Sequence, residues 1–296
     1  MGHVIVEVAI NGGVTPEQNP HVPTTHTEIA AEAAACVEAG ASIVHLHVAE
    51  YGRGPEVSAE AYLECFLPVW AEQPDALLYP TVDTWQGKVS YQHIAHLAAH
   101  PSLRIGLCDP GSVNLGRAGA DGPCNGFVYA NSPDLIGSAL DIHTEHRLGP
   151  SLAIYEPGFL RTVLAFREAG RLPAGSMVKL YFSTERGLMG APFGLPPTRK
   201  ALEAYLEMLE GTDLPWAVSL AGGDLVASEV ARMALDLGGH LHIGVEFFGG
   251  DRTPTNLQLL EEAFALCDAA GHQVATAAQT VEILGLPERD QSTVPA

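Results

Sequence analysis

Short apolar runs alternate with longer segments of helical periodicity along the chain, and this alternation limits the folds available to it. Such runs are too short and too apolar for half-exposed hairpin strands, so they predict buried parallel strands that are each followed by a helix. Eight strand–helix units predict a single TIM (β/α)8 barrel domain over residues 1–296, with an open doubly wound α/β sheet as the alternative. The predicted strands are His3–Ile10, Ser42–Val48, Ala76–Val82, Leu103–Cys108, Ser151–Tyr155, Met177–Phe182, Trp216–Leu220 and His240–Glu246.

Helix signals fit between these strands. Thr25 and Glu28 form a capping-box pattern at the start of the first helix, and Gly40 follows its end, where a left-handed residue is favoured. The loops Asp109–Ser132 and Ser183–Thr198 are long, which suits active-site loops better than simple connections. The predicted helices are Glu28–Ala39, Ala59–Trp70, Tyr91–Ala99, Pro133–His146, Phe159–Ala169, Arg199–Leu209, Ala227–Leu237 and Thr255–Ala270.

Two histidines stand at the end of the second predicted strand. Strand side chains alternate in direction, so His45 and His47 face one side together and Leu46 faces the other. Two adjacent imidazoles are half of a zinc site, although a pair of hydrogen-bonded histidines has the same pattern. Catalytic groups of a barrel lie where its strands end, and this position favours metal binding.

A carboxylate at the end of the eighth predicted strand supplies a third ligand. Glu246 closes an otherwise apolar stretch, and a buried carboxylate is costly unless it meets a cation or a metal. Two histidines and one carboxylate leave an open coordination position, which is typical of catalytic zinc. His242 shares the face of Glu246 and is a fourth ligand, a group supporting the ligands or a packed core histidine.

Other polar residues follow the remaining strands, and most of these we interpret as loop or capping residues. Asp83 is the best candidate for a general base, because it follows Thr81 by two positions and comes after a strand next to His45 and His47. The alternative is a solvated aspartate in a turn. The further residues at strand ends are Asn11, Asp109, Glu156, Ser183 and Ser219.

Composition excludes several classes of protein. The 15 Lys and Arg against 35 Asp and Glu give a net charge of −20, which leaves a nucleic-acid partner little electrostatic basis. No basic-then-apolar signal precedes the first strand, and no apolar stretch approaches the roughly 18 residues that span a bilayer. Five cysteines without a CxxC pair are typical of reduced thiols. We therefore expect a cytoplasmic protein without membrane or nucleic-acid partners.

The segments EAGASIVHLH, DPGSVNLG and GGHLHIGVE resemble those of the beta-keto acid cleavage enzyme family, and weaker similarity runs nearly from end to end. This resemblance implies a TIM barrel, a zinc ion held by His45, His47 and Glu246, and a homotetramer. It also implies cleavage of a β-keto acid with acetyl-CoA to give acetoacetate and a new acyl-CoA. The residues that we expect to contact the substrate are Asn11, Ser112, Asn114, Glu156 and Arg252.

The chain departs from the family pattern in its catalytic groups. An arginine four residues before the metal-binding glutamate is replaced by His242, and an aspartate directly after it by Phe247. The family serine at the third strand aligns with Thr81, which keeps a hydroxyl, so we expect Thr81, Asp83 and His242 to be catalytic. The missing cation would be His242, Arg252 or Arg186, and the missing base Asp83, Glu156 or Asp251.

Two further departures bear on the substrate. The arginine of the family HLHxR segment is Ala49 here, and Val14 replaces a glutamate of the amino-substrate enzymes, which disfavours an aminated keto acid. Only 15 cationic side chains serve the whole chain, few for the phosphates of CoA. Three hypotheses follow: zinc-dependent cleavage of a keto acid with or without acetyl-CoA, a metal-dependent hydrolase or lyase acting without CoA, and an inactive metal-binding barrel.

Overall fold

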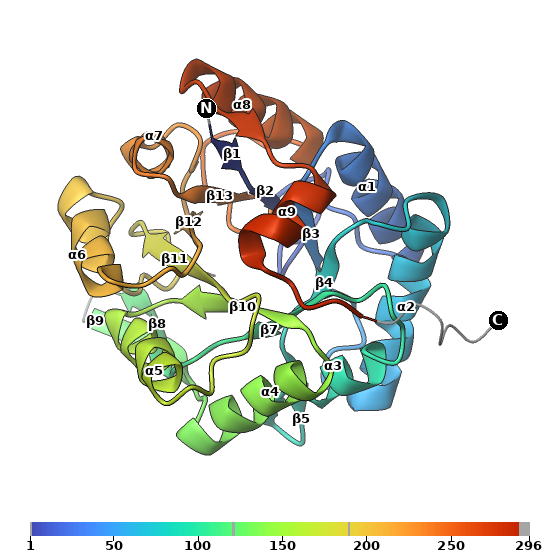
Figure 1. Ribbon diagram of the computed structural model, residues 1–296. Coiled ribbons are helices and arrows are strands. Elements are labelled where there is room, and N and C mark those ends of the chain that lie inside the picture. The colour runs from blue at the N-terminus through green and yellow to red at the C-terminus, as the bar shows by residue number, and fades with distance from the viewer. Residues whose placement is uncertain (1, 120–121, 189, 290–296) are drawn as a thin grey trace.

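Eight parallel strands form a sheet that curves into a nearly closed barrel surrounded by helices (Figure 1). The computed structural model describes residues 2–119, 122–188 and 190–289. The first and last strands of the sheet lie beside each other, and the predicted TIM barrel is confirmed. In sheet order the strands are β4 (Leu78–Pro80), β3 (Ile43–Leu46), β2 (Val6–Ala9), β13 (His240–Ile243), β12 (Trp216–Ala221), β11 (Met177–Ser183), β10 (Gly149–Ile154) and β7 (Ile105–Cys108).

The eight predicted helices are present, with ends that shift by a few residues. The first shows its predicted caps: the Thr25 hydroxyl accepts from Glu28 N, a Glu28 carboxylate oxygen accepts from Thr25 N, and Gly40 is left-handed. A further helix near the C-terminal end of the described chain was not predicted. The helices are α1 (His26–Ala39), α2 (Pro55–Glu72), α3 (Gln92–Leu97), α4 (Pro133–Glu145), α5 (Pro157–Glu168), α6 (Arg199–Leu209), α7 (Glu229–Asp236), α8 (Asn256–Ala269) and α9 (Ala277–Leu284).

Two antiparallel hairpins lie in segments for which no strand was predicted. The long segment Asp109–Ser132 after β7 contains β8 (Val113–Gly119) and β9 (Gly122–Tyr129), a hairpin that was not predicted. A ribbon forms because the two strands satisfy each other's backbone groups, which an extended surface loop leaves to water. A second hairpin, β5 (Asp83–Trp85) with β6 (Lys88–Ser90), follows β4, and β1 (His3–Val4) pairs with β14 (Gln273–Val274). Residues 184–188 and 190–198 carry no named helix or strand.

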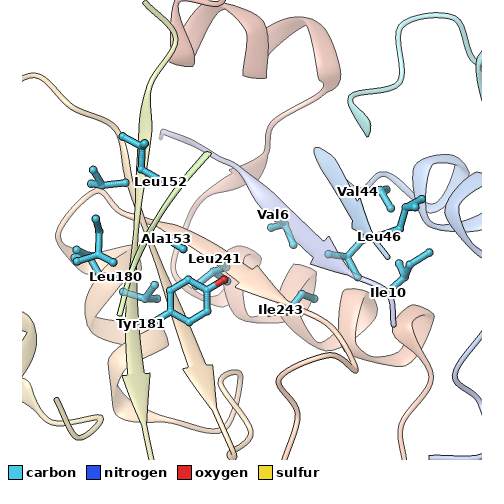
Figure 2. Close-up of a cluster of buried hydrophobic side chains, with 14 of the residues drawn as sticks. Val6, Ile10, Val44, Leu46, Leu152, Ala153, Leu180, Tyr181, Leu241 and Ile243 are labelled. Atoms are coloured by element: carbon cyan, nitrogen blue, oxygen red, sulfur yellow. The ribbon is translucent and has the colours of Figure 1, made fainter. Parts of the chain in front are cut away.

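Alternation along the strands divides the core into two clusters. The larger cluster consists mainly of side chains between one face of the strands and the surrounding helices, although it also includes Tyr181, and Figure 2 shows part of it around β2, β3 and β13. The other face points into the barrel, where Ile5, Ile43 and Met177 pack with Leu284 and Leu286. The helix α9 therefore closes the amino end of the barrel, where Figure 1 shows it over the centre of the ring. The opposite end, where the strands terminate, is left for the functional site.

None of the helices in the described residues is long and apolar enough to cross a membrane. The predicted reduced thiols agree with four buried free cysteines, Cys36, Cys65, Cys108 and Cys267. The side chain of Cys124 lies outside the described part of the structure.

Candidate metal site at the barrel mouth

His45, His47 and Glu246 meet where β3 and β13 end, with β2 lying between these two strands. The Nε2 atoms of the two imidazoles are 3.2 Å apart. Glu246 Oε1 lies 3.0 Å from His47 Nε2, and Oε2 lies 3.5 Å from His45 Nε2. Ligand atoms bound at about 2.1 Å to one tetrahedral zinc ion are themselves roughly 3.4 Å apart, so the three groups have suitable spacing for one metal.

The surroundings of these groups also suit a cation. Burial, together with repulsion from His47, Lys179 and His242, holds the pKa of His45 well below its usual range, which keeps the imidazole neutral. Glu246 Oε2 is buried and accepts no hydrogen bond within the described part of the structure. A buried carboxylate oxygen without a donor is costly, and a metal ion would satisfy it. The three side chains thus fit the ligand set predicted from the sequence.

Asn11, at the end of β2, holds the backbone of His47 in place. Its Nδ2 donates to His47 O at 2.9 Å, and its Oδ1 accepts from His47 N at 2.9 Å and from Gly12 N at 2.8 Å. The predicted substrate-binding amide therefore makes its contacts within the protein. Groups that orient metal ligands in this way affect metal affinity without touching the metal.

Gly12 lies against Glu246, and its replacement by alanine is expected to weaken metal binding about 10- to 100-fold. Its φ of +59° favours glycine, and an added Cβ would come within 2.1 Å of Glu246 Cγ, so the carboxylate must move. Titration with a competing chelator would measure the change. Gly13→Ala is the matched control because open space surrounds that position. Equal affinity in the wild type and Gly12→Ala would contradict the prediction.

Asp83 is buried within the protein rather than solvated. Its Oδ2 accepts from Ser58 Oγ at 2.6 Å, and its Oδ1 accepts from Gly52 N at 2.8 Å and from Thr84 N at 2.6 Å. The side chain is 3% exposed. The alternative of a solvated turn aspartate is therefore wrong, and these contacts favour a role in joining β5 to the loop after β3 and to α2.

Thr81 lies between β4 and β5 and is held through its backbone. Its N–H donates to the Tyr62 hydroxyl at 3.2 Å, and its carbonyl is 2.8 Å from His93 Nε2. Burial lowers the pKa of His93 to about 4, so this ring is neutral and donates to the carbonyl. The predicted catalytic hydroxyl thus stands on a fixed segment of backbone near the barrel mouth.

His242 points into the barrel below the metal ligands and is fully buried. Its Nδ1 lies 2.9 Å from Ser219 Oγ, and its Nε2 lies 3.3 Å from Glu7 Oε1. Burial, with a smaller contribution from Lys179, holds the pKa of His242 well below its usual range. Of the three interpretations left open, the fourth ligand is disfavoured, because His242 is not among the described side chains whose ligand atoms lie close enough together to hold one ion, which are His45, His47 and Glu246.

The other residues that we predicted to contact the substrate either bond to groups within the protein or are exposed to solvent. Glu156 precedes α5 and its Oε1 accepts from Gly194 N at 3.0 Å. The guanidinium of Arg252 contacts Asp224 at 2.9 Å and both carboxylate oxygens of Glu262 at 2.5 Å. Ser112 Oγ bonds the backbone of Asn131, at 3.0 Å to its carbonyl and 2.9 Å to its N–H. Asn114 is exposed in β8 opposite Val128.

Asp109 directly follows β7 and was not selected from the sequence as a functional residue. Its carboxylate is 2% exposed, and Oδ2 accepts from the Tyr129 hydroxyl at 2.5 Å. Burial raises the pKa of Asp109 to about 6, against the lowering effects of Tyr129, Lys179 and His47. Its strand-end position was visible in the sequence, but Tyr129 comes from the unpredicted hairpin.

Aromatic rings line the same side of the barrel mouth as Asp109. The half-buried ring of Tyr155 makes edge contacts with Tyr129, Tyr181 and Phe193 at centroid distances of 6.3, 4.8 and 5.2 Å. Tyr181 contacts Phe247, which directly follows the ligand Glu246, at 5.1 Å. The arrangement gives the mouth an apolar wall on one side of the metal ligands.

Several known proteins resemble this chain over most of its length. The 3-oxoadipate:acetyl-CoA acetyltransferase of Cupriavidus necator is 26% identical over 97% of this chain and 96% of its own. The 3-keto-5-aminohexanoate cleavage enzyme of Fusobacterium nucleatum is 26% identical over 97% and 99%. The 3-dehydrocarnitine:acetyl-CoA trimethylamine transferase of Rhizobium meliloti is 24% identical over 92% of each chain.

Solved structures of other proteins share this fold, and a match to a family model shows to which family the chain belongs. The apo structure of ObcA aligns with a TM-score of 0.67 at 15% identity, over 90% of this chain and 66% of that chain, so this chain spans just under two thirds of it. A type I 3-dehydroquinate dehydratase of Clostridium difficile aligns with a TM-score of 0.55 at 12% identity, over 91% and 94%. The model of the beta-keto acid cleavage enzyme family matches residues 3–286, and the chain therefore belongs to this family of enzymes.

Proposed function

We propose that this enzyme uses a zinc ion at His45, His47 and Glu246 to cleave a small β-keto acid with acetyl-CoA, giving acetoacetate and a new acyl-CoA. The observation that carries the proposal is the clustering of these three side chains at the mouth of a barrel of this family. Relatives whose names specify acetyl-CoA as co-substrate support that part of the proposal. Cytoplasmic location and assembly as a homotetramer remain predictions.

The protein side chains have separate tasks in such a site. A zinc ion, when bound, supplies a Lewis acid for the ketone oxygen of the substrate. Asn11 fixes the backbone of His47, and Gly12 leaves room for the Glu246 side chain. The rings of Tyr155, Tyr181 and Phe247 exclude water from one side of the reacting atoms, which strengthens electrostatic interactions there.

A metal-dependent hydrolase or lyase acting without CoA is the second candidate, and the arginines favour it. Arg186 donates to Gly249 O and to Asp251, while Arg252 is paired with Asp224 and Glu262. Carboxylate partners compete with the phosphates of CoA for these cations. His242, the residue in place of the family arginine, is neutral at ordinary pH because burial lowers its pKa. Both observations weaken anion binding at this mouth.

A panel of short β-keto acids with acetyl-CoA and the zinc-loaded enzyme tests the proposal, with mass spectrometry of the acyl-CoA and acetoacetate formed. We expect turnover about 10²- to 10³-fold slower than in typical members, because charge-stabilising contacts to the reacting groups are missing. Rapid turnover would show that the replaced residues matter less than we infer. Absence of any acyl-CoA product, with hydrolysis or elimination of a substrate instead, would favour the second candidate.

A further inference from the structure

The proposed cleavage needs a base, and the acidic residues that the sequence favoured for it already have partners. Both oxygens of Asp83 accept hydrogen bonds from the protein. Glu156 accepts from the backbone of the loop after β11. Asp251 is paired with Arg186 at 2.7 Å, and its side chain is 91% exposed to solvent. A general base must offer a lone pair to the substrate, and both oxygens of Asp83 are already occupied, while Glu156 holds a loop through Oε1 and Asp251 is paired at the exposed surface.

Asp109 has a free lone pair in a buried position. Tyr129 donates to its Oδ2, whereas Oδ1 is buried and has no hydrogen-bond partner among the described residues. The backbone of Asp109 is fixed as well, since its N–H donates to the Tyr91 hydroxyl at 3.1 Å. A buried carboxylate oxygen without a donor is uncommon in folded proteins and calls for an explanation.

The position of Asp109 connects it with the metal ligands. It follows β7 at the same end of the barrel where His45, His47 and Glu246 lie, and the charges of His47 and Glu246 both act on it. Burial raises the pKa of Asp109 to about 6. A general base is most effective when its pKa lies near the pH of the reaction, so this value suits a reaction near neutral pH. The titratable groups that act on Asp109 or respond to it are Tyr51, Tyr91, Cys108, Tyr129, Tyr155, Lys179, His47 and Glu246.

We propose that Asp109 is the catalytic base of this enzyme, with its free Oδ1 facing the substrate and Tyr129 as the positioning residue that holds Oδ2. The inference rests on the proposed function. In the step that it serves, the C–H bond between the ketone and the carboxylate of the keto acid breaks. The electron pair of that bond forms the enolate, and the proton moves to Asp109 Oδ1. Asp109 thus takes over the role of the aspartate that follows the metal-binding glutamate in the family, a position that Phe247 occupies in this chain.

Exchange of substrate protons with solvent tests this step without a known keto acid. Acetoacetate is the probe, because the proposed cleavage forms it from any substrate, and NMR would follow loss of its C2 protons in D2O with zinc-loaded enzyme. We expect Asp109→Asn to lower the enzyme-catalysed exchange by about 10²- to 10⁴-fold. Zinc content and circular dichroism of the variant should match the wild type. Asp141→Asn, at an exposed salt bridge on α4, is the matched control with unchanged exchange.

The pH profile separates a base from a structural carboxylate. Only the ionised carboxylate accepts a proton, so wild-type exchange should rise as the pH increases through about 6 and then level off. The Tyr129 hydroxyl lowers the pKa of Asp109, so Tyr129→Phe should move this rise to higher pH while zinc stays bound. A merely structural role for Tyr129 predicts no such movement.

The outcomes distinguish this inference from the function on which it rests. Normal exchange in Asp109→Asn, or loss of its zinc, would overturn the role of Asp109, and loss of exchange in Asp83→Asn alone would assign the base to Asp83. Keto acid cleavage by a wild type that exchanges no C2 protons would overturn the base but leave the function intact. A wild type with neither exchange nor cleavage would overturn both.

Discussion

Replacing His47 with alanine is expected to lower the affinity for a divalent metal by at least about 100-fold while the barrel stays folded. The ring supplies one of three ligand atoms, and the loss should exceed the roughly 10- to 100-fold effect of changing a group that only orients a ligand. The fold should persist because His47 lies beyond the end of β3 and its side chain is 24% exposed. Elemental analysis after dialysis against zinc measures the change.

The control for this variant is another histidine outside the cluster. His96 on α3 has a side chain that is 44% exposed, and His96→Ala should keep one equivalent of metal. Circular dichroism and thermal unfolding of both variants establish that any loss of metal is local. Full metal content in His47→Ala would mean that the ion binds elsewhere, and the assignment of His45 and Glu246 would fall with it.

Periodicity in the sequence was sufficient to predict the barrel, because each strand–helix unit shows its own local pattern. The predicted boundaries differ most at α2, which begins at Pro55 instead of Ala59, since Pro fits the first turn of a helix. The two hairpins were missed because their strands pair only with each other and lie outside the strand–helix alternation of the barrel. The helix α9 was missed although it starts with a capping box at Thr276 and Gln279, and its apolar side chains fill the amino end of the barrel.

The candidate metal site was predicted because its ligands follow from two local facts. His45 and His47 are two residues apart and share one face at the end of a predicted strand, and Glu246 ends the apolar stretch of another predicted strand that lies two positions away in the sheet. The environment of the acidic groups could not be predicted in this way. Asp83 is saturated by Ser58 and Gly52, which come from distant segments, and Asp109 meets Tyr129 only because β8 and β9 fold back as a hairpin.

The barrel interior holds a buried ion pair that gives the second large expected effect. Lys179 Nζ lies 2.9 Å from Glu7 Oε1, and the two side chains are 2% and 0% exposed. Tyr79 bridges the pair: Nζ donates to its oxygen at 2.6 Å, and its hydroxyl donates to Glu7. The ring of Tyr79 also stacks on the ligand His45, with centroids 4.5 Å apart. The pair therefore supports the floor of the metal site.

Lys179→Met is expected to lower the free energy of unfolding by about 3–5 kcal/mol, because it keeps the length of the side chain but leaves the Glu7 carboxylate buried without its cation. The double variant Glu7→Gln with Lys179→Met removes both charges and so leaves no buried charge without a partner. It should recover most of the free energy of unfolding that Lys179→Met loses. Guanidinium chloride unfolding of the wild type, the two single variants and the double variant forms the required cycle. The interpretation as a charged pair predicts strong coupling between the two sites, whereas additive effects would mean that Glu7 and Lys179 share the interior without stabilising each other.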